Sequence, residues 1–185
     1  IFFKLLKMLE QYAVEEKYSM IVGVSNKMAT TGWQKSISMN LLCQLDVLLG
    51  YGDLGLNNLS LTNDHFYPLW NEKQINWRKK NPYNKVFLKK EKKLKFISPS
   101  VLSLFEIFSY VDYEKYNLEF DKKNFNFLPK LFIGLAPEYR DKFYFKIPEF
   151  IKPSPLNFIY KDLSKKNIIL DKKKCYFSYI DFDAY

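Results

Sequence analysis

Apolar and polar positions alternate most regularly in the first fifty residues of the chain. From residue 1 to 17, apolar side chains fall on one side of a helical repeat, and Lys and Glu fall on the other. The next segment is a short β-prone run that ends in Ser25-Asn26, a pair that favours turns and helix caps. The elements that this pattern predicts are a helix over 1–17, a strand over 19–24, a loop over 25–31, a short helix over 32–36 and a strand over 40–49.

The rest of the chain is less regular. The glycines at 50–55 lack the Gly-x-Gly-x-x-Gly spacing of a phosphate cradle, so this segment is interpreted as a turn. The elements predicted after it are a helix over 64–80, a β-hairpin with strands 83–89 and 94–97, a helix over 99–108, and strands over 131–135, 143–147, 156–160 and 176–180. The pattern predicts a mixed α/β fold in two parts, residues 1–55 and 56–185, with the boundary near residues 52–63.

The charge of the chain raises the question of a nucleic-acid partner. The formal net charge is +9, but nearly every basic residue is lysine, and Arg78 and Arg140 are the only arginines. Arginine is the usual bidentate reader of phosphates and guanine, so this composition argues against a nucleic-acid partner. The lysine-rich segment 89–95 is interpreted as a solvated hairpin tip.

Composition also bears on the compartment. The hydrophobic content of 48% argues against disorder, and charges or glycine interrupt every apolar run well short of a membrane-spanning length. Cys43 and Cys175 lie far apart, and neither has a Cys or His at metal-ligand spacing. Buried thiols in a reducing compartment are the favoured interpretation, which predicts a cytoplasmic protein without a membrane partner.

Two local features allow a functional and a structural interpretation. Trp77-Arg78 could stack on a ligand or bind a carboxylate; the favoured alternative is that Trp77 anchors its helix and Arg78 pairs with a local carboxylate. Asp181 and Asp183 have strand spacing, so both side chains would face one way and could hold a cation or a substrate amine. The favoured alternative for this pair is a charged C-terminal edge.

The apolar run that ends in Gly23-Val24-Ser25-Asn26, followed by a short helix, resembles the C-terminal half of a GNAT-superfamily N-acyltransferase domain. In one branch of that family a splayed strand ends in a Gly-Phe-Pro-Asn-type exit, of which only the Gly and the Asn are present here. Segments around Trp70–Pro82 and 152–183 are similar to the C-terminal extension of two-part bacterial GNAT-like proteins. The resemblance implies half of a GNAT-like domain over 1–55, a degenerate second GNAT-like part over 56–185, and a fragment whose N-terminal portion lies upstream.

The resemblance also implies a chemistry. Acetyl-CoA or another acyl-CoA would donate its acyl group by direct attack of an amine acceptor such as an amino sugar. The cofactor-binding residues would be Val24, Ser25, Asn26 and Trp33. Trp33 lies where the family commonly has a tyrosine that protonates the leaving thiolate, and an indole N–H is no such acid. The alternatives are a packing role for Trp33 and a left-handed loop conformation for Asn26, and no catalytic base is identified.

Three functions therefore follow from the sequence, in this order. The first is the N-acyltransferase fragment. The second is a non-catalytic GNAT-like module that binds a glycan or a protein partner, favoured by the tryptophan and by the eroded exit motif. The third is a basic nucleic-acid-binding protein.

Overall fold

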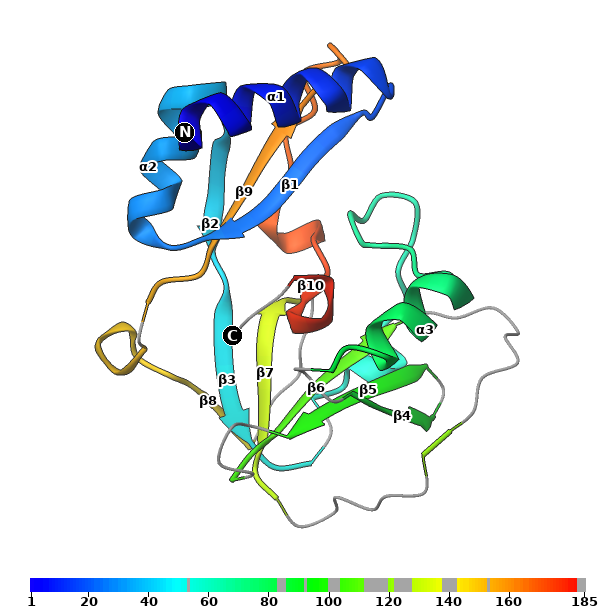
Figure 1. Ribbon diagram of the computed structural model, residues 1–185. Helices are drawn as coiled ribbons and strands as arrows, with labels where there is room; N and C mark the ends of the chain where they lie inside the picture. Colours follow the sequence, from blue (N-terminus) through cyan, green and yellow to red (C-terminus); the bar gives the residue numbers. More distant parts are fainter. Residues whose placement is uncertain are drawn as a thin grey trace. The chain divides into compact units, whose positions relative to one another are not determined.

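The computed structural model describes residues 1–52, 54–82, 86–91, 93–99, 104–111, 120–121, 128–137, 143–152 and 154–182 (Figure 1). The chain divides into two compact units. Unit 1 comprises Ile1–Leu45 and Pro148–Lys172, and unit 2 comprises Asp46–Ile147 and Lys173–Tyr185. The mixed α/β class expected from the sequence is confirmed, since the described chain contains three α-helices and two sheets. This division differs from the two consecutive parts expected from the sequence, 1–55 and 56–185, because the chain leaves unit 1 at Leu45 and returns to it at Pro148.

Unit 1 is a three-stranded antiparallel sheet with two helices. Its elements are α1 (Phe2–Glu15), β1 (Met20–Ser25), α2 (Lys27–Ile37), β2 (Asn40–Gln44) and β9 (Asn157–Asp162). β9 lies between β1 and β2 and is antiparallel to both, so the two outer strands run parallel to each other. Leu6 of α1 and Ile37 of α2 pack with Met39 and Ile159 in one buried cluster, which holds both helices on the sheet.

The structure changes two of the expected elements in this unit. The expected loop over 25–31 is wrong, because α2 begins at Lys27 and the Asn26 side chain accepts the N–H of Ala29 at 2.8 Å as its N-cap. The expected strand over 40–49 is in fact two strands, β2 and β3 (Asp46–Gly50), which belong to different sheets. Leu45 separates them, and its N–H donates to the carbonyl of Leu156 at 2.8 Å.

Unit 2 contains a seven-stranded sheet in the order β4-β5-β6-β7-β3-β8, with β10 paired to β7. All its pairings are antiparallel except β6 with β7. The bounds of the elements not yet given are α3 (Glu72–Lys79), β4 (Phe87–Lys90), β5 (Leu94–Pro99), β6 (Glu106–Val111), β7 (Lys130–Leu135), β8 (Tyr144–Lys146) and β10 (Phe177–Ser178). The short 3-10 helices are labelled η1 (Leu56–Asn58), η2 (Glu149–Ile151, in unit 1), η3 (Lys172–Lys174) and η4 (Tyr179–Asp181).

Two apolar clusters hold unit 2 together. One contains Phe108 and Phe132 from neighbouring strands, together with Leu54 and Leu56 from the segment around η1. The other joins Ile75 of α3 and Ile180 of η4 to Leu88 and Val111 of the sheet. The residues of β6 alternate between these clusters, as the period of two along a strand requires.

Two glycines allow backbone segments of unit 2 to approach closely. A Cβ at Gly50 would lie 2.2 Å from the carbonyl oxygen of Phe143, and one at Gly134 would lie 2.1 Å from that of Phe177. Both distances are far below van der Waals contact. Any side chain at these positions would therefore separate β3 from the start of β8, or β7 from β10.

The outcome for the other expected elements of unit 2 is mixed. The hairpin and the strands over 131–135 and 143–147 are confirmed, as is the strand over 156–160 in unit 1, although residues 83–85 lie outside the described part. The expected helix over 64–80 is wrong for its first half, since α3 starts only at Glu72. The expected helix over 99–108 is wrong for Pro99, which belongs to β5, and for Glu106–Phe108, which belong to β6; residues 100–103 are not described. The strand expected over 176–180 continues into η4 after Ser178.

Candidate functional site

The junction between β1 and α2 contains three of the four residues expected to bind a cofactor. Beyond the cap formed by its side chain, Asn26 also accepts at its carbonyl oxygen a 2.7 Å hydrogen bond from the Thr30 hydroxyl. Asn157 of β9 donates to Thr30 Oγ1 at 2.7 Å, and Ser25 Oγ lies 2.7 Å from the same oxygen. Because the single Thr30 proton goes to Asn26, the Ser25 hydroxyl is the donor in that pair. The hydroxyl of Ser25 and the side chain of Asn26 thus stabilise unit 1 through hydrogen bonds within it.

Backbone geometry and packing settle two of the alternatives. Asn26 has φ −76° and ψ 172°, so a left-handed conformation is wrong. Trp33 is half-buried and packs against the cluster of α1, α2 and β9 residues. Its ring meets that of Phe2 edge-on, with centroids 6.3 Å apart. This is the packing role weighed for Trp33 from the sequence.

The backbone at the same junction has a different character. β1 is an outer strand of its sheet, and its register pairs Val24 with Phe158 on the β9 side. Among the described strands, nothing pairs with its other edge. The first turn of α2, with the backbone N–H groups of Lys27 and Met28, follows directly. An amide edge beside a helix N-terminus suits an extended ligand that carries amide and anionic groups.

Catalytic groups are harder to assign. The only histidine, His65, lies in unit 2, where its Nδ1 pairs with the Thr62 hydroxyl at 2.8 Å and accepts the Thr62 N–H at 3.2 Å. Within the described ranges, no three His, Cys, Asp or Glu side chains are grouped closely enough to hold a metal ion. Both cysteines are thiols, Cys175 fully buried and Cys43 partly buried.

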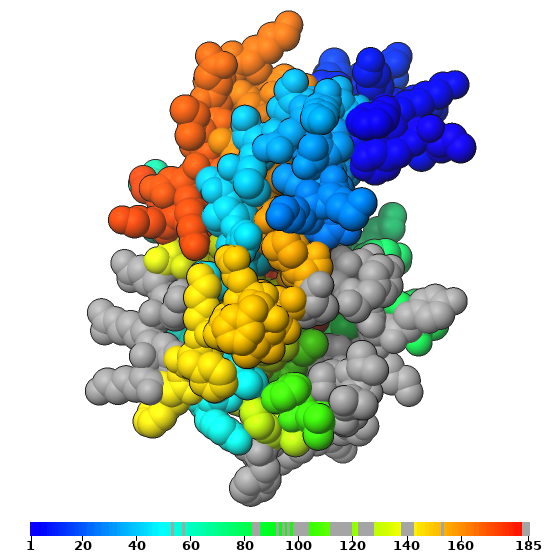
Figure 2. Space-filling view, turned by 90° about the vertical axis from the view of Figure 1, so that its left-hand side faces the viewer, coloured from blue at the N-terminus to red at the C-terminus, as the bar shows by residue number. Residues whose placement is uncertain are grey.

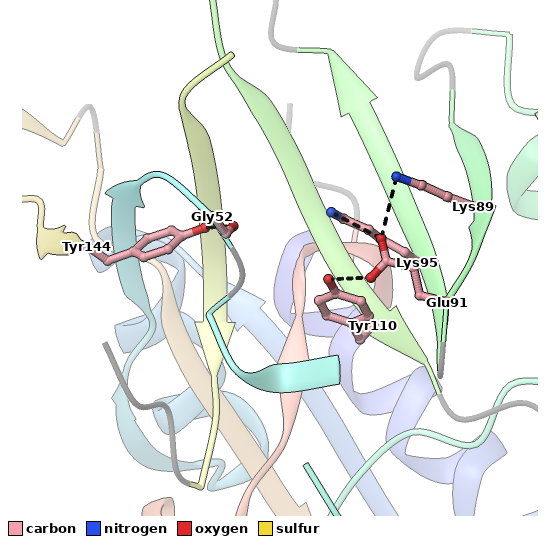
Figure 3. A network of polar contacts seen from close by, with 6 residues as sticks. All are labelled: Gly52, Lys89, Glu91, Lys95, Tyr110 and Tyr144. Atoms are coloured by element: carbon pink, nitrogen blue, oxygen red, sulfur yellow. Dashed lines mark hydrogen bonds and ion pairs between the residues drawn. The ribbon is translucent and has the colours of Figure 1, made fainter. Parts of the chain in front are cut away.

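A polar network in unit 2 surrounds Lys95 on β5 (Figure 3). Glu91 bridges it: one carboxylate oxygen lies 3.8 Å from Nζ of both Lys89 and Lys95, and the other accepts the Tyr110 hydroxyl at 3.0 Å. The Lys95 ammonium also lies 5.4 Å from the centroid of the Phe108 ring and 5.6 Å from that of Tyr110. The figure also shows the Tyr144 hydroxyl, which donates to the carbonyl of Gly52 at 3.0 Å.

Burial dominates the electrostatics of this network. Lys95 is only 4% exposed, and burial, followed by the charge of Lys130, lowers the pKa of its ammonium. Glu106, 2% exposed, has a carboxyl pKa raised by burial against the opposing effect of Lys95, and its Oε2 has no hydrogen-bond partner among the described residues. Burial thus disfavours the charged forms of both Lys95 and Glu106, and the opposite charges of the two groups act against that effect.

The solvated hairpin tip expected over 89–95 is therefore wrong for Lys95 and for the buried Lys93. Lys95 pairs with Tyr110 and shares a face with Ile97. A period of two counted from Ile97 is the sequence signal that marks position 95 as inward-facing.

The C-terminal acid candidate is part of the fold of unit 2. Asp181 accepts the Trp70 indole N–H at 2.7 Å and the backbone N–H of Ser178 at 2.8 Å. Burial raises the pKa of Asp181 to about 6 against these hydrogen bonds. It is an internal anchor rather than the charged edge expected from the sequence, and Asp183 lies outside the described residues.

In the neighbouring Trp77-Arg78 pair, the anchoring role favoured for Trp77 is wrong. Trp77 is 64% exposed, so it does not anchor α3; fully buried Ile75 does. Arg78 is buried, donates to the carbonyl of Phe182 at 2.7 Å, and places its guanidinium carbon 5.8 Å from the Trp77 ring centroid. Arg78 also acts electrostatically on the carboxylate of Asp181.

A feature missed by the sequence analysis lies on α1. Leu5, Met8, Leu9 and Tyr12, here called the α1 strip, have exposed fractions between 42% and 56%, whereas Leu6 on the same helix is 5% exposed. Figure 2 shows the side chains of α1, in dark blue, at the surface of unit 1. Positions 5, 8, 9 and 12 fall on one side of a helix. The apolar stripe of the sequence is thus wider than the sheet covers, and part of it faces solvent.

Comparisons of the chain with protein-family models, with curated proteins and with solved structures gave no match.

Proposed function

We propose that unit 1 is a non-catalytic binding module that contacts a protein partner through the α1 strip. The α1 strip itself supports this proposal. Isolated exposed apolar residues are ordinary on a protein surface, but contiguous patches of them mark interaction sites. Here four large apolar side chains adjoin on one helix face, and each is at least 42% exposed.

The β1–α2 junction also favours binding over catalysis. Ser25 and Asn26 use their side-chain oxygens in hydrogen bonds inside the unit. Trp33 packs against Phe2, and an indole N–H cannot protonate a leaving thiolate. An acyltransferase needs a base for the amine and a donor for the thioester oxygen, and these side chains supply neither.

The test compares two leucines on the same helix. Leu6→Ala removes a side chain buried on the sheet and should lower the free energy of unfolding by about 2–5 kcal/mol. Leu9→Ala makes the same chemical change in the α1 strip and should cost less than about 1 kcal/mol. Urea unfolding at low protein concentration, followed by circular dichroism, measures both.

A Leu9→Ala variant as unstable as Leu6→Ala would contradict the proposal. It would mean that the α1 strip contributes to the fold of the chain, so its side chains would not be available to a partner.

A second candidate is the acyl-CoA-dependent N-acyltransferase with an amine acceptor such as an amino sugar. The observation that favours it is the outer edge of β1 beside the first turn of α2. The pantetheine arm of coenzyme A carries amides that can pair with a strand edge, and the pyrophosphate of coenzyme A suits a helix N-terminus. A titration with acetyl-CoA separates this candidate from the first.

The proposal extends to the compartment in which the module works. The thiols Cys43 and Cys175 support a reducing compartment such as the cytoplasm. No helix within the described ranges is long and apolar enough to cross a membrane.

A further inference from the structure

We infer that the partner of the α1 strip is a second copy of this chain, packed antiparallel through α1 against α1. The inference rests on the proposed function and names the partner. It is carried by two features of the helix: the symmetry of the α1 strip about its midpoint, and the charges beside its ends.

The α1 strip suits a two-fold axis. Its apolar positions are 5, 8, 9 and 12, which are symmetric about the point between Met8 and Leu9. An axis through that point places Leu5 of one copy opposite Tyr12 of the other and Met8 opposite Leu9. Each apolar side chain then meets an apolar side chain, as the self-complementary interface of a two-fold dimer requires.

The charges select the antiparallel arrangement. Lys4 and Glu15 are eleven positions apart, close to three helical turns, so they lie on the same side of α1 beside opposite ends of the α1 strip. Gln11 Nε2 donates to Glu15 Oε1 at 2.8 Å and steadies that carboxylate. An antiparallel pair places Lys4 beside Glu15 of the other copy at both ends, whereas a parallel pair would place these residues on opposite sides of the interface, where they do not meet.

The helix ends favour the same arrangement. In an antiparallel pair the positive N-terminal end of each helix lies near the negative C-terminal end of the other. The charge pattern and the backbone dipole therefore agree on one orientation.

The size of the surface determines the expected strength. Four partly exposed side chains on each copy bury less area than the roughly 1,200 Å² of a stable interface. We expect a reversible dimer that forms with rising concentration and stays monomeric when dilute.

The experiment is sedimentation equilibrium of the full chain over about 5–500 μM, the range in which weak dimers dissociate. The wild type should shift from monomer to dimer across this range. Lys4→Glu and Glu15→Lys should each weaken dimerisation roughly tenfold, because each puts like charges together at both ends. The double variant Lys4→Glu/Glu15→Lys restores opposite charges and should recover most of the wild-type affinity.

The variants carry their own folding control. Lys4→Glu puts an acid in the first turn of α1 and Glu15→Lys puts a base in the last turn, and both changes suit the helix dipole. Thermal unfolding at low concentration should therefore match the wild type. Leu9→Lys, which puts a charge in the centre of the α1 strip, should abolish the dimer.

Two outcomes would overturn the inference. One is a wild-type chain that remains monomeric throughout the range; the other is a double variant no better than either single variant. Neither outcome would contradict the proposed function, which depends on the relative stabilities of Leu6→Ala and Leu9→Ala. A monomer with a dispensable Leu9 would mean that the partner is a different protein.

Discussion

The α1 strip of unit 1 and the core of unit 2 differ in how they place apolar and charged side chains. In unit 1 the α1 strip faces solvent, although the adjoining face of the same helix is packed on the sheet. In unit 2 the rings of Phe108 and Phe132 are fully buried, and the charged Lys95 and Glu106 are buried as well. A difference in composition does not explain this, since both units are rich in lysine and aromatic residues.

The difference follows from how many faces of each sheet are covered, and by what. In unit 2 the segment around η1 contributes to one apolar cluster, while α3 and η4 contribute to another. A buried lysine needs partners that compensate for its lost hydration, and the ammonium of Lys95 contacts Glu91 and the rings of Phe108 and Tyr110. The sheet of unit 1 is too narrow to cover the whole apolar side of α1. The remaining apolar side chains are then available for another molecule.

The largest effect is expected in the aromatic cluster of unit 2. Phe108 is fully buried, with its ring centroid 5.9 Å from those of Tyr110 and Phe132. Phe108→Ala should lower the free energy of unfolding by about 3–5 kcal/mol, through lost burial and the cavity left behind. The matched control is Phe145→Ala on β8, where the ring is 58% exposed and the expected cost is below about 1 kcal/mol. Urea unfolding measures both, and equal losses would contradict the described core.

The next effect concerns pH and contrasts two aspartates. Burial raises the folded pKa of Asp181 in unit 2 to about 6, above its ordinary value of 3.8. Its contribution to stability is therefore fully present below pH 4 and is lost as the pH rises through 6. The free energy of unfolding of the wild type, relative to that of Asp181→Asn, should therefore rise by up to about 3 kcal/mol when the pH is lowered from 7 to 4.

Asp162 in unit 1 supplies the contrast of opposite sign. Hydrogen bonds, first from the Ser164 hydroxyl and then from the Ile168 N–H, lower the pKa of this carboxyl. Its contribution is present above its ordinary pKa and is lost as the pH falls through the folded pKa. Chemical denaturation of Asp162→Asn should therefore show a stability deficit that shrinks in acid. If the two variants had the same pH dependence, the contrast between the units would be wrong.

The parts of the fold that the sequence predicted are those with a strong local signal. The hairpin of β4 and β5, and strands β7, β8 and β9, have runs rich in β-branched and aromatic residues between turn signals. The first helix and strand also follow directly from the apolar pattern. The mixed α/β class depends only on these elements, which explains why it could be predicted.

The remainder depends on contacts that are distant in sequence. The run over 40–49 is mostly apolar, and its polar residues Gln44 and Asp46 do not by themselves indicate that the chain changes sheet at Leu45. The apolar positions 101, 104, 105 and 108 have helical spacing, but the pairing of β6 with β5 and β7 overrides that signal at residues 106–108. The polar residues at the end of β1 lie where the sequence indicated, and their role in cofactor binding stays a prediction. The Thr30–Asn157 contact at this position spans 127 positions of sequence, which no local signal indicates.

The most direct test of the account is a thermal-shift titration of the chain with acetyl-CoA. The controls are Asn26→Ala and Asn71→Ala, because each removes an N-cap asparagine but only Asn26 lies at the β1–α2 junction. Each cap is worth about 1 kcal/mol, so both variants should melt at slightly lower temperature than the wild type.

A non-catalytic module predicts that millimolar acetyl-CoA shifts none of the three melting temperatures. Ligand binding would instead stabilise the native chain, by about 2.7 kcal/mol at one hundred times the dissociation constant. Saturable stabilisation of the wild type and Asn71→Ala, weakened in Asn26→Ala, would contradict the account and establish an acyl-CoA site at the end of β1.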